Sequence, residues 1–177
     1  MTYSFDEFCA DTRSAIQTMK GAEAHEAVRG NLEKLLSNEA FVAENCGPDA
    51  EPGIRTIYRD EETDFNVLVH VYDQGKKGPP HDHGTSWAVY GQAVGWTDMT
   101  GWRRLDKGTG VENAEIAQDR TVRLEPGMAG KFEVGEIHSI EFPAGARFVR
   151  VTGTDLDAIP TLRFNPEAGT AKVGSRL

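Results

Sequence analysis

Two histidines lie one residue apart in the segment GPPHDHG, which spans residues 78–84. On an extended strand, residues two apart point to the same face, so His81 and His83 are expected to aim together. Two imidazoles whose Cβ atoms are about 6.5–7 Å apart can converge on one ion through bonds of about 2.0–2.2 Å. The two prolines before His81 stiffen the approach and remove two backbone donors. The pair is therefore a candidate for two ligands of a metal site.

A third histidine follows a glycine-rich segment with the pattern Gly127-x5-Glu133-x-Gly135-x2-His138. Glycines before a lone histidine indicate a tight turn that delivers the side chain from a neighbouring strand. The alternative is that the HxH pair lies on a solvated edge strand and that His138 is a hydrogen-bonded core residue. That alternative leaves the paired glycine spacings as a coincidence.

Both segments resemble motifs of the cupin family. The first is similar to G-x5-H-x-H-x(3,4)-E-x6-G, and the second to G-x5-P-x-G-x2-H-x3-N. The matching positions are Gly75, His81, His83, Gly95, Gly127, Gly135 and His138. The chain departs from the motifs where Trp87 or Ala88 stands for the glutamate, Glu133 for the proline and Phe142 for the asparagine. The resemblance implies an all-β cupin fold, a double-stranded β-helix or jelly-roll barrel, with a three-histidine site and no carboxylate ligand.

Within the cupins, the run DFNVLVHVYDQGKKGPPHDHG and the helices expected before it resemble the cysteine dioxygenase-like thiol dioxygenases. This resemblance implies a non-haem iron dioxygenase in which Arg55, 26 residues before His81, binds the substrate carboxylate. The Ser-x-His-x-Tyr triad of that group is missing, because Arg150 and Thr152 replace its histidine and tyrosine. A different small acid or thiol, or a different reaction, is therefore as well supported as oxidation of cysteine.

Three neutral imidazoles leave the full charge of a divalent ion uncompensated. Iron(II) is the expected cofactor, and nickel, zinc or copper also suit imidazole ligands. With iron, the expected reaction is insertion of dioxygen into a small metal-chelating carboxylate or thiol. Two alternatives stay open: a non-oxidative isomerase, lyase or hydrolase, and a protein that binds a small acid without turnover.

Three further residues are candidates for the substrate pocket. Arg150 shares a strand face with Phe148 and Thr152, and together with Arg55 it would favour an anionic substrate. Trp87 would share the face of His83 by alternation, and a bulge after His83 would reverse that. Of the two remaining histidines, His70 either points inward beside the metal or is a structural residue of the sheet, and the structural interpretation is preferred; His25 is interpreted as a surface residue.

The pattern of apolar residues divides the chain, interpreted as one domain, into three parts. Residues 1–50 are expected to be helical, with a capping box at Ser4–Glu7 and helices packed outside the barrel. Residues 51–160 are expected to form the β-barrel, and 161–177 a C-terminal strand and tail. The expected strands cover 53–59, 65–72, 81–90, 92–98, 100–105, 120–125, 129–133, 137–142 and 146–152.

Composition narrows the range of partners. Of the 177 residues, 38% are hydrophobic and 27% charged, and the net charge is −9. This charge argues against nucleic acid or an anionic membrane as partner. The two cysteines lack metal-ligand spacing and the N-terminus lacks signal-peptide features, so a cytoplasmic protein is expected. A homodimer is compatible with these properties.

Overall fold

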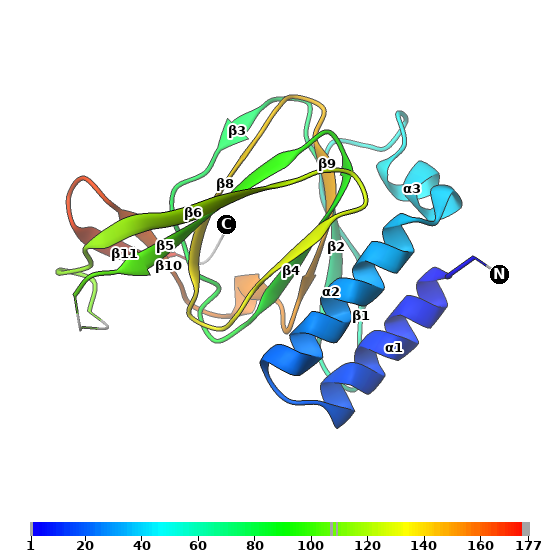
Figure 1. Ribbon diagram of the computed structural model, residues 1–177, viewed down its shortest axis with the longest axis horizontal. Helices are drawn as coiled ribbons and strands as arrows, with labels where there is room; N and C mark the ends of the chain where they lie inside the picture. Colours follow the sequence, from blue (N-terminus) through cyan, green and yellow to red (C-terminus); the bar gives the residue numbers. More distant parts are fainter. Residues whose placement is uncertain (1, 107, 109, 175–177) are drawn as a thin grey trace.

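The computed structural model describes residues 2–106, 108 and 110–174, and its N-terminal part is helical (Figure 1). Helix α1 spans Phe5–Thr18, α2 spans Ala22–Leu36 and α3 spans Glu39–Cys46. The Ser4 hydroxyl accepts a hydrogen bond from the Glu7 amide, while the Glu7 carboxylate accepts one from the Ser4 amide at 2.7 Å. The predicted helical segment and its capping box are therefore confirmed.

The rest of the described chain is mostly β-structure, with one short 3-10 helix, η1 (Leu156–Ala158). The strands are β1 (Gly53–Arg59), β2 (Asn66–Val71), β3 (Lys76–Lys77), β4 (Ala88–Val94), β5 (Thr97–Arg104), β6 (Ile116–Leu124), β7 (Ala129–Phe132), β8 (Ile137–Phe142), β9 (Arg147–Thr152), β10 (Thr161–Asn165) and β11 (Thr170–Gly174).

These strands form two antiparallel sheets and a hairpin. The helix-side sheet has the order β1-β2-β9-β4-β7, the outer sheet has the order β3-β8-β5-β6, and β10 pairs with β11. Neighbours such as β2 and β9 are distant in sequence, because the chain crosses repeatedly between the sheets. This is the jelly roll, or double-stranded β-helix, that the sequence predicts.

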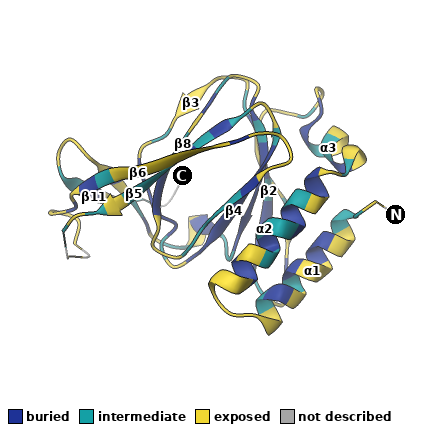
Figure 2. Cartoon of the chain, in the orientation of Figure 1, coloured by how far each residue is buried: buried dark blue, intermediate teal, exposed yellow. Residues whose placement is uncertain are grey.

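The helices cover the outer face of the helix-side sheet, and their inward faces are buried (Figures 1 and 2). Side chains from both layers are fully buried at this contact: Phe8, Val28, Leu32, Leu35, Val67, Val69, Val149 and Val151. Each such side chain stabilises the fold by about 1.5–3 kcal/mol. No described helix is long and apolar enough to span a membrane.

A second core lies between the two sheets. Its members come from both layers: Tyr90, Met99, Leu124, Phe142 and Phe148. Along β9, the alternation of the strand sends Val149 and Val151 to the helices and Phe148 to this interior. The jelly-roll interior is therefore a packed layer, and the candidate site is embedded in it.

Four expected elements differ in the structure. Residues 81–90 are not one strand: His81 makes an isolated bridge, and β4 begins only at Ala88. The strands expected at 92–98 and 100–105 are replaced by β4 and β5, which meet around Gly95. The expected C-terminal strand is a hairpin, because the Asn165 side chain accepts hydrogen bonds from the amides of two following residues and forms a turn. Residues 175–177 of the expected tail lie outside the described chain.

Candidate metal centre

Two of the three histidines are joined through their backbones. His138 lies on β8, and the amides of His81 and His138 each donate to the carbonyl of the other, at 2.8 and 2.9 Å. The segment around His81 thus lies beside β8 as a further strand. Residues paired in this way project from the same face of a sheet, so both imidazoles enter the interior.

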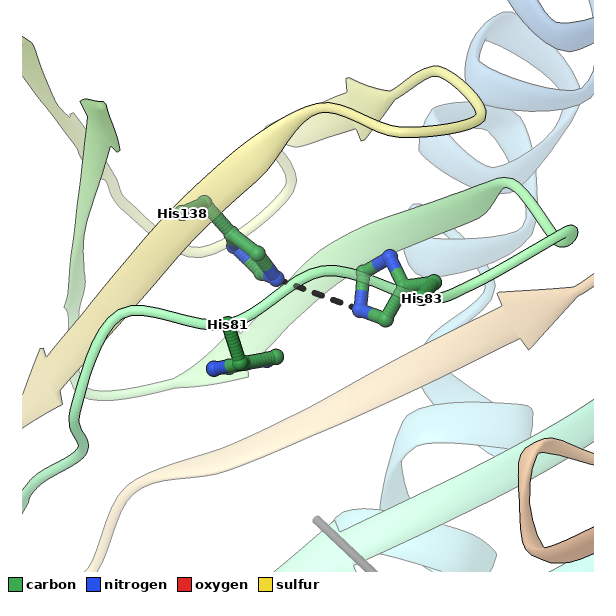
Figure 3. A group of neighbouring side chains, drawn as sticks. All are labelled: His81, His83 and His138. Carbon is green, nitrogen blue, oxygen red and sulfur yellow. Dashed lines mark hydrogen bonds between the residues drawn. The ribbon is translucent and has the colours of Figure 1, made fainter. Parts of the chain in front are cut away.

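His83 reaches the same point from a turn. The Ser86 amide donates to the His83 carbonyl at 3.0 Å, and the chain then turns toward β4. The Nε2 atoms of His83 and His138 lie 3.1 Å apart and face each other (Figure 3). One nitrogen from each of the three histidines lies within 4.8 Å of the others.

Burial keeps the three imidazoles neutral. Desolvation, with a smaller repulsion from Arg150, lowers the pKa of His81 to about 4. The same dominant cause holds the pKa of His83 and of His138 well below the ordinary value. A neutral imidazole is the form that ligates a metal.

The donor set fits a divalent transition metal. Two Nε2 atoms 3.1 Å apart, each bonded at about 2.0–2.1 Å to a shared ion, subtend about 95–100°. The Nδ1 atom of His81 donates to the Pro79 carbonyl at 3.0 Å and leaves its Nε2 free to ligate. His83 and His138 bring their Nε2 lone pairs together in a fully buried place. A shared cation would use both lone pairs, whereas one hydrogen bond between the rings uses only one.

A cavity of about 160 Å³ adjoins His81. The apolar part of its wall comes from Ile54, Ile140, Phe142 and the rings of Tyr72 and Tyr90. The Tyr90 hydroxyl lies 3.1 Å from the Nε2 atom of His83, and burial raises the pKa of this phenol. Arg150 enters the cavity from β9. A ligand in this space would contact His81, one of the three candidate ligands, together with a phenol and a guanidinium.

Arg55 does not line this cavity, contrary to expectation. The alternation of β1 directs Ile54 to the cavity and Arg55 to the opposite face. There the Arg55 guanidinium donates to the Asn45 carbonyl at 3.3 Å. Arg55 thus contacts the end of α3, and it is not a candidate for binding substrate in this cavity.

Trp87 also lies on the wrong face for the proposed pocket. Gly84 adopts φ +59°, so the alternation counted from His83 is broken before Trp87. The indole belongs to the helix-side core, where it stacks on His25 with ring centroids 4.7 Å apart. A turn at Gly84 thus interrupts the strand on which the alternation was counted, and Trp87 faces the helix-side core.

His25 is buried, although the sequence suggested a surface residue. Its side chain is held between Trp87 and Glu133, with Nδ1 at 2.5 Å from the Glu133 carboxylate. Its residue exposure is 9%. The histidine begins a helix, and its depth follows from the packing of that helix against β7, which helical periodicity alone does not reveal.

Several cavity residues carried no clear signal in the sequence. His70 was interpreted as structural, but it lines the cavity beside Tyr72. Tyr90 occupies no defined position of either sequence motif, yet its hydroxyl contacts a candidate ligand. Arg163 comes from β10, a segment whose pattern is weak. The alternation of β2 could have placed His70 on the inner face, opposite the valines that meet the helices.

Comparison with known proteins shows distant likenesses only. No family model and no curated protein matches the sequence. Among solved structures, the chain is similar to the cupin domain of Schizosaccharomyces pombe Cnp3, with 14% identity and a TM-score of 0.45 over 61% of this chain and 66% of that one. It is also similar to KdgF from Halomonas sp., with 19% identity and a TM-score of 0.41 over 59% of this chain and 81% of that one.

An oxalate oxidase bound to the substrate analogue glycolate aligns with 17% identity and a TM-score of 0.39, over 51% of this chain and 42% of that one. The chain therefore spans less than two thirds of the Cnp3 domain and of the oxalate oxidase. TM-scores below 0.5 carry no assignment of function. The jelly-roll fold rests on the strand order, and the candidate function rests on the site.

Proposed function

We propose that this chain is a mononuclear metal-dependent oxygenase of the cupin superfamily, acting on a small acid or thiol that ligates the metal. The observation that carries the proposal is the convergence of three buried, neutral histidines, one of which, His81, lines an interior cavity. His81, His83 and His138 would hold the ion, which we take to be iron(II), although nickel, zinc and copper suit the same ligands.

The neutrality of the ligands favours a substrate that brings its own negative charge. Bound iron(II) would supply the electrons for dioxygen chemistry once an anionic substrate ligates it. The protein supplies orientation and exclusion of water. Phe142 and Ile140 close one side of the cavity, and the Tyr90 hydroxyl lies next to His83, where an incoming ligand would meet it.

The likeness to thiol dioxygenases extends to the ligands but not to the residues around them. Arg150 points into the cavity from the position where that group has a histidine, and Arg55 lies outside it. We therefore propose a substrate other than cysteine.

Metal analysis and oxygen uptake together test the proposal. We expect the purified protein to contain iron and to consume oxygen with at least one compound from a panel of small thiols, diketones and hydroxy acids. His81→Ala should abolish both metal content and uptake. His25→Ala, a histidine outside the site, should retain both.

The alternatives give different results. Bound zinc, with turnover of a compound in the absence of oxygen, would indicate isomerase, lyase or hydrolase chemistry. Ligand binding without turnover by any metal-loaded form would indicate a binding protein. Absence of metal affinity in the micromolar range would refute a metal-dependent function altogether.

A further inference from the structure

Arg150 is a buried cation without a carboxylate partner. It is 9% exposed, and no carboxylate of the described residues lies within 4 Å of its guanidinium. Its Nε atom has no hydrogen-bond partner in the described chain, and the guanidinium lies against the Tyr90 hydroxyl. A buried charge without compensation is costly. An anion that binds in the cavity would compensate this charge.

Two more cations face the same cavity. Lys76 comes from β3, and Arg163 comes from the C-terminal hairpin. The bridge between His81 and Arg163 is antiparallel, so their side chains project from the same face. No Asp or Glu is among the described residues that line the cavity. Three positive side chains and no negative one indicate a place for an anion.

A second residue of the cavity wall also has a buried nitrogen without a partner among the described residues. His70 is 3% exposed, and its Nε2 atom has no partner in the described chain. Its Nδ1 atom lies 3.3 Å from the Tyr72 hydroxyl, and its ring stacks on Phe148 with centroids 4.6 Å apart. These contacts fix the ring and leave its buried Nε2 atom without a hydrogen-bond partner in the described chain.

The size of the cavity limits the ligand. Its volume of about 160 Å³ is well below the roughly 300–1,000 Å³ of pockets that bury drug-sized ligands. A compact molecule of a few heavy atoms fits, and nucleotides or long acyl chains do not. The wall also contains aromatic and aliphatic side chains, so the ligand needs a short carbon skeleton as well as its charge.

We infer that this cavity is the acid-binding subsite of the enzyme, in which Arg150 holds a carboxylate of a compact carboxylic acid and Arg163 adds a second cation. The remainder of the acid extends toward His81 and the proposed metal. This last step rests on the proposed function. Binding of the carboxylate itself does not, because none of these residues is a metal ligand.

Malonate is a suitable probe, with malonamide as an uncharged molecule of the same shape. We would measure their binding by isothermal titration calorimetry to protein that has been stripped of metal and freed of chelator. Malonate should bind and malonamide should not. Arg150→Gln should weaken malonate about 10- to 100-fold, as expected for a hydrogen bond to a charged group. Arg163→Gln should have a smaller effect, since Arg163 is exposed.

Two further variants serve as controls for the binding experiment. Arg103→Gln removes an exposed arginine of β5 outside the cavity and should leave malonate affinity unchanged. Arg150→Lys keeps the charge and should retain part of the affinity if Arg150→Gln fails to fold. Equal malonate affinity in wild type and in folded Arg150→Gln, or equal binding of malonamide, would overturn the inference.

The inference and the proposed function fail separately. Cobalt(II) titration of the same preparations reports the metal site without reference to malonate. If the protein binds metal but its malonate affinity does not change when Arg150 is substituted, the subsite is refuted and the proposed metal centre is still supported. Malonate binding through Arg150 in a protein without metal affinity supports the subsite and refutes the oxygenase.

Discussion

Two glycines near the metal ligands allow the geometry around His83 to be tested by a matched pair of substitutions. Gly84 directly follows His83 and has φ +59°, and a Cβ atom there would lie 2.2 Å from the Pro160 carbonyl oxygen. Gly135 lies three residues before His138 and has φ +79°, and a Cβ atom there would meet nothing within 4 Å. Alanine is thus strained at both sites and obstructed at one.

The two effects give different magnitudes. A left-handed backbone costs an alanine about 1–2 kcal/mol, and forcing an atom into a packed space costs about 1–3 kcal/mol more. Gly135→Ala should therefore lower the free energy of unfolding by about 1–2 kcal/mol, and Gly84→Ala by about 2–5 kcal/mol. The gain from a less flexible unfolded chain is the same for both and cancels in the difference.

Urea denaturation of the metal-free proteins measures both values, with unchanged m-values as the check on two-state unfolding. The obstruction at Gly84 must be relieved by moving the turn, so His83 should move with it. We expect metal affinity to fall by about 10- to 100-fold in Gly84→Ala and to stay near the wild-type value in Gly135→Ala. Free energies of unfolding that agree within about 0.5 kcal/mol would refute the reasoning.

Other predictions concern more distant contacts. Asp60→Asn should cost about 3 kcal/mol, since buried Asp60 accepts hydrogen bonds from Arg13. Burial opposes ionisation, yet Arg13 and its neighbours hold the pKa of Asp60 below the usual range. This contribution is complete above about pH 4 and is lost as the pH falls through the folded-state pKa, which urea titrations at several pH values would reveal. His25→Ala should lose about 2 kcal/mol in the same assay by removing the stack on Trp87. Zinc at 100 times its dissociation constant should stabilise the metal-free protein by about 2.7 kcal/mol, and His138→Ala should remove that gain.

The sequence predicted the helices and most strands because their signals are local. The capping box at Ser4 and the alternation from Asn66 to Val71 each depend on a few neighbouring residues. The predicted orientation of Trp87 was wrong for a local reason as well, because the turn at Gly84, a residue with positive φ, interrupts the alternation. The strand order was accessible only through the resemblance to cupins, because pairings such as β2 with β9 join segments about 80 residues apart.

The residues around the cavity were harder to predict than the ligands. The three histidines stand out because their type is rare in this chain and their spacing is regular. Arg163 and Tyr90 lie in unremarkable sequence patterns, and their proposed role follows from which strands become neighbours. Arg163, for example, reaches the cavity because the hairpin binds beside His81, where the Phe164 amide donates to the Pro80 carbonyl at 2.8 Å. No periodicity within residues 161–174 contains that information.

The missing Ser-x-His-x-Tyr triad can also be interpreted from the strands that become neighbours in the sheet. Its histidine and tyrosine are absent from β9, where Arg150 and Thr152 stand. The adjacent strand β2 carries His70 opposite Phe148, and His70 lies within hydrogen-bond distance of Tyr72. An imidazole and a phenol are thus present at the cavity, on the neighbouring strand, while β9 contributes a guanidinium. The aligned positions on β9 lack both groups, whereas His70 and Tyr72 bring an imidazole and a phenol to the cavity beside the Arg150 guanidinium. The guanidinium that β9 brings to the cavity supports the proposal that the ligand is a compact acid.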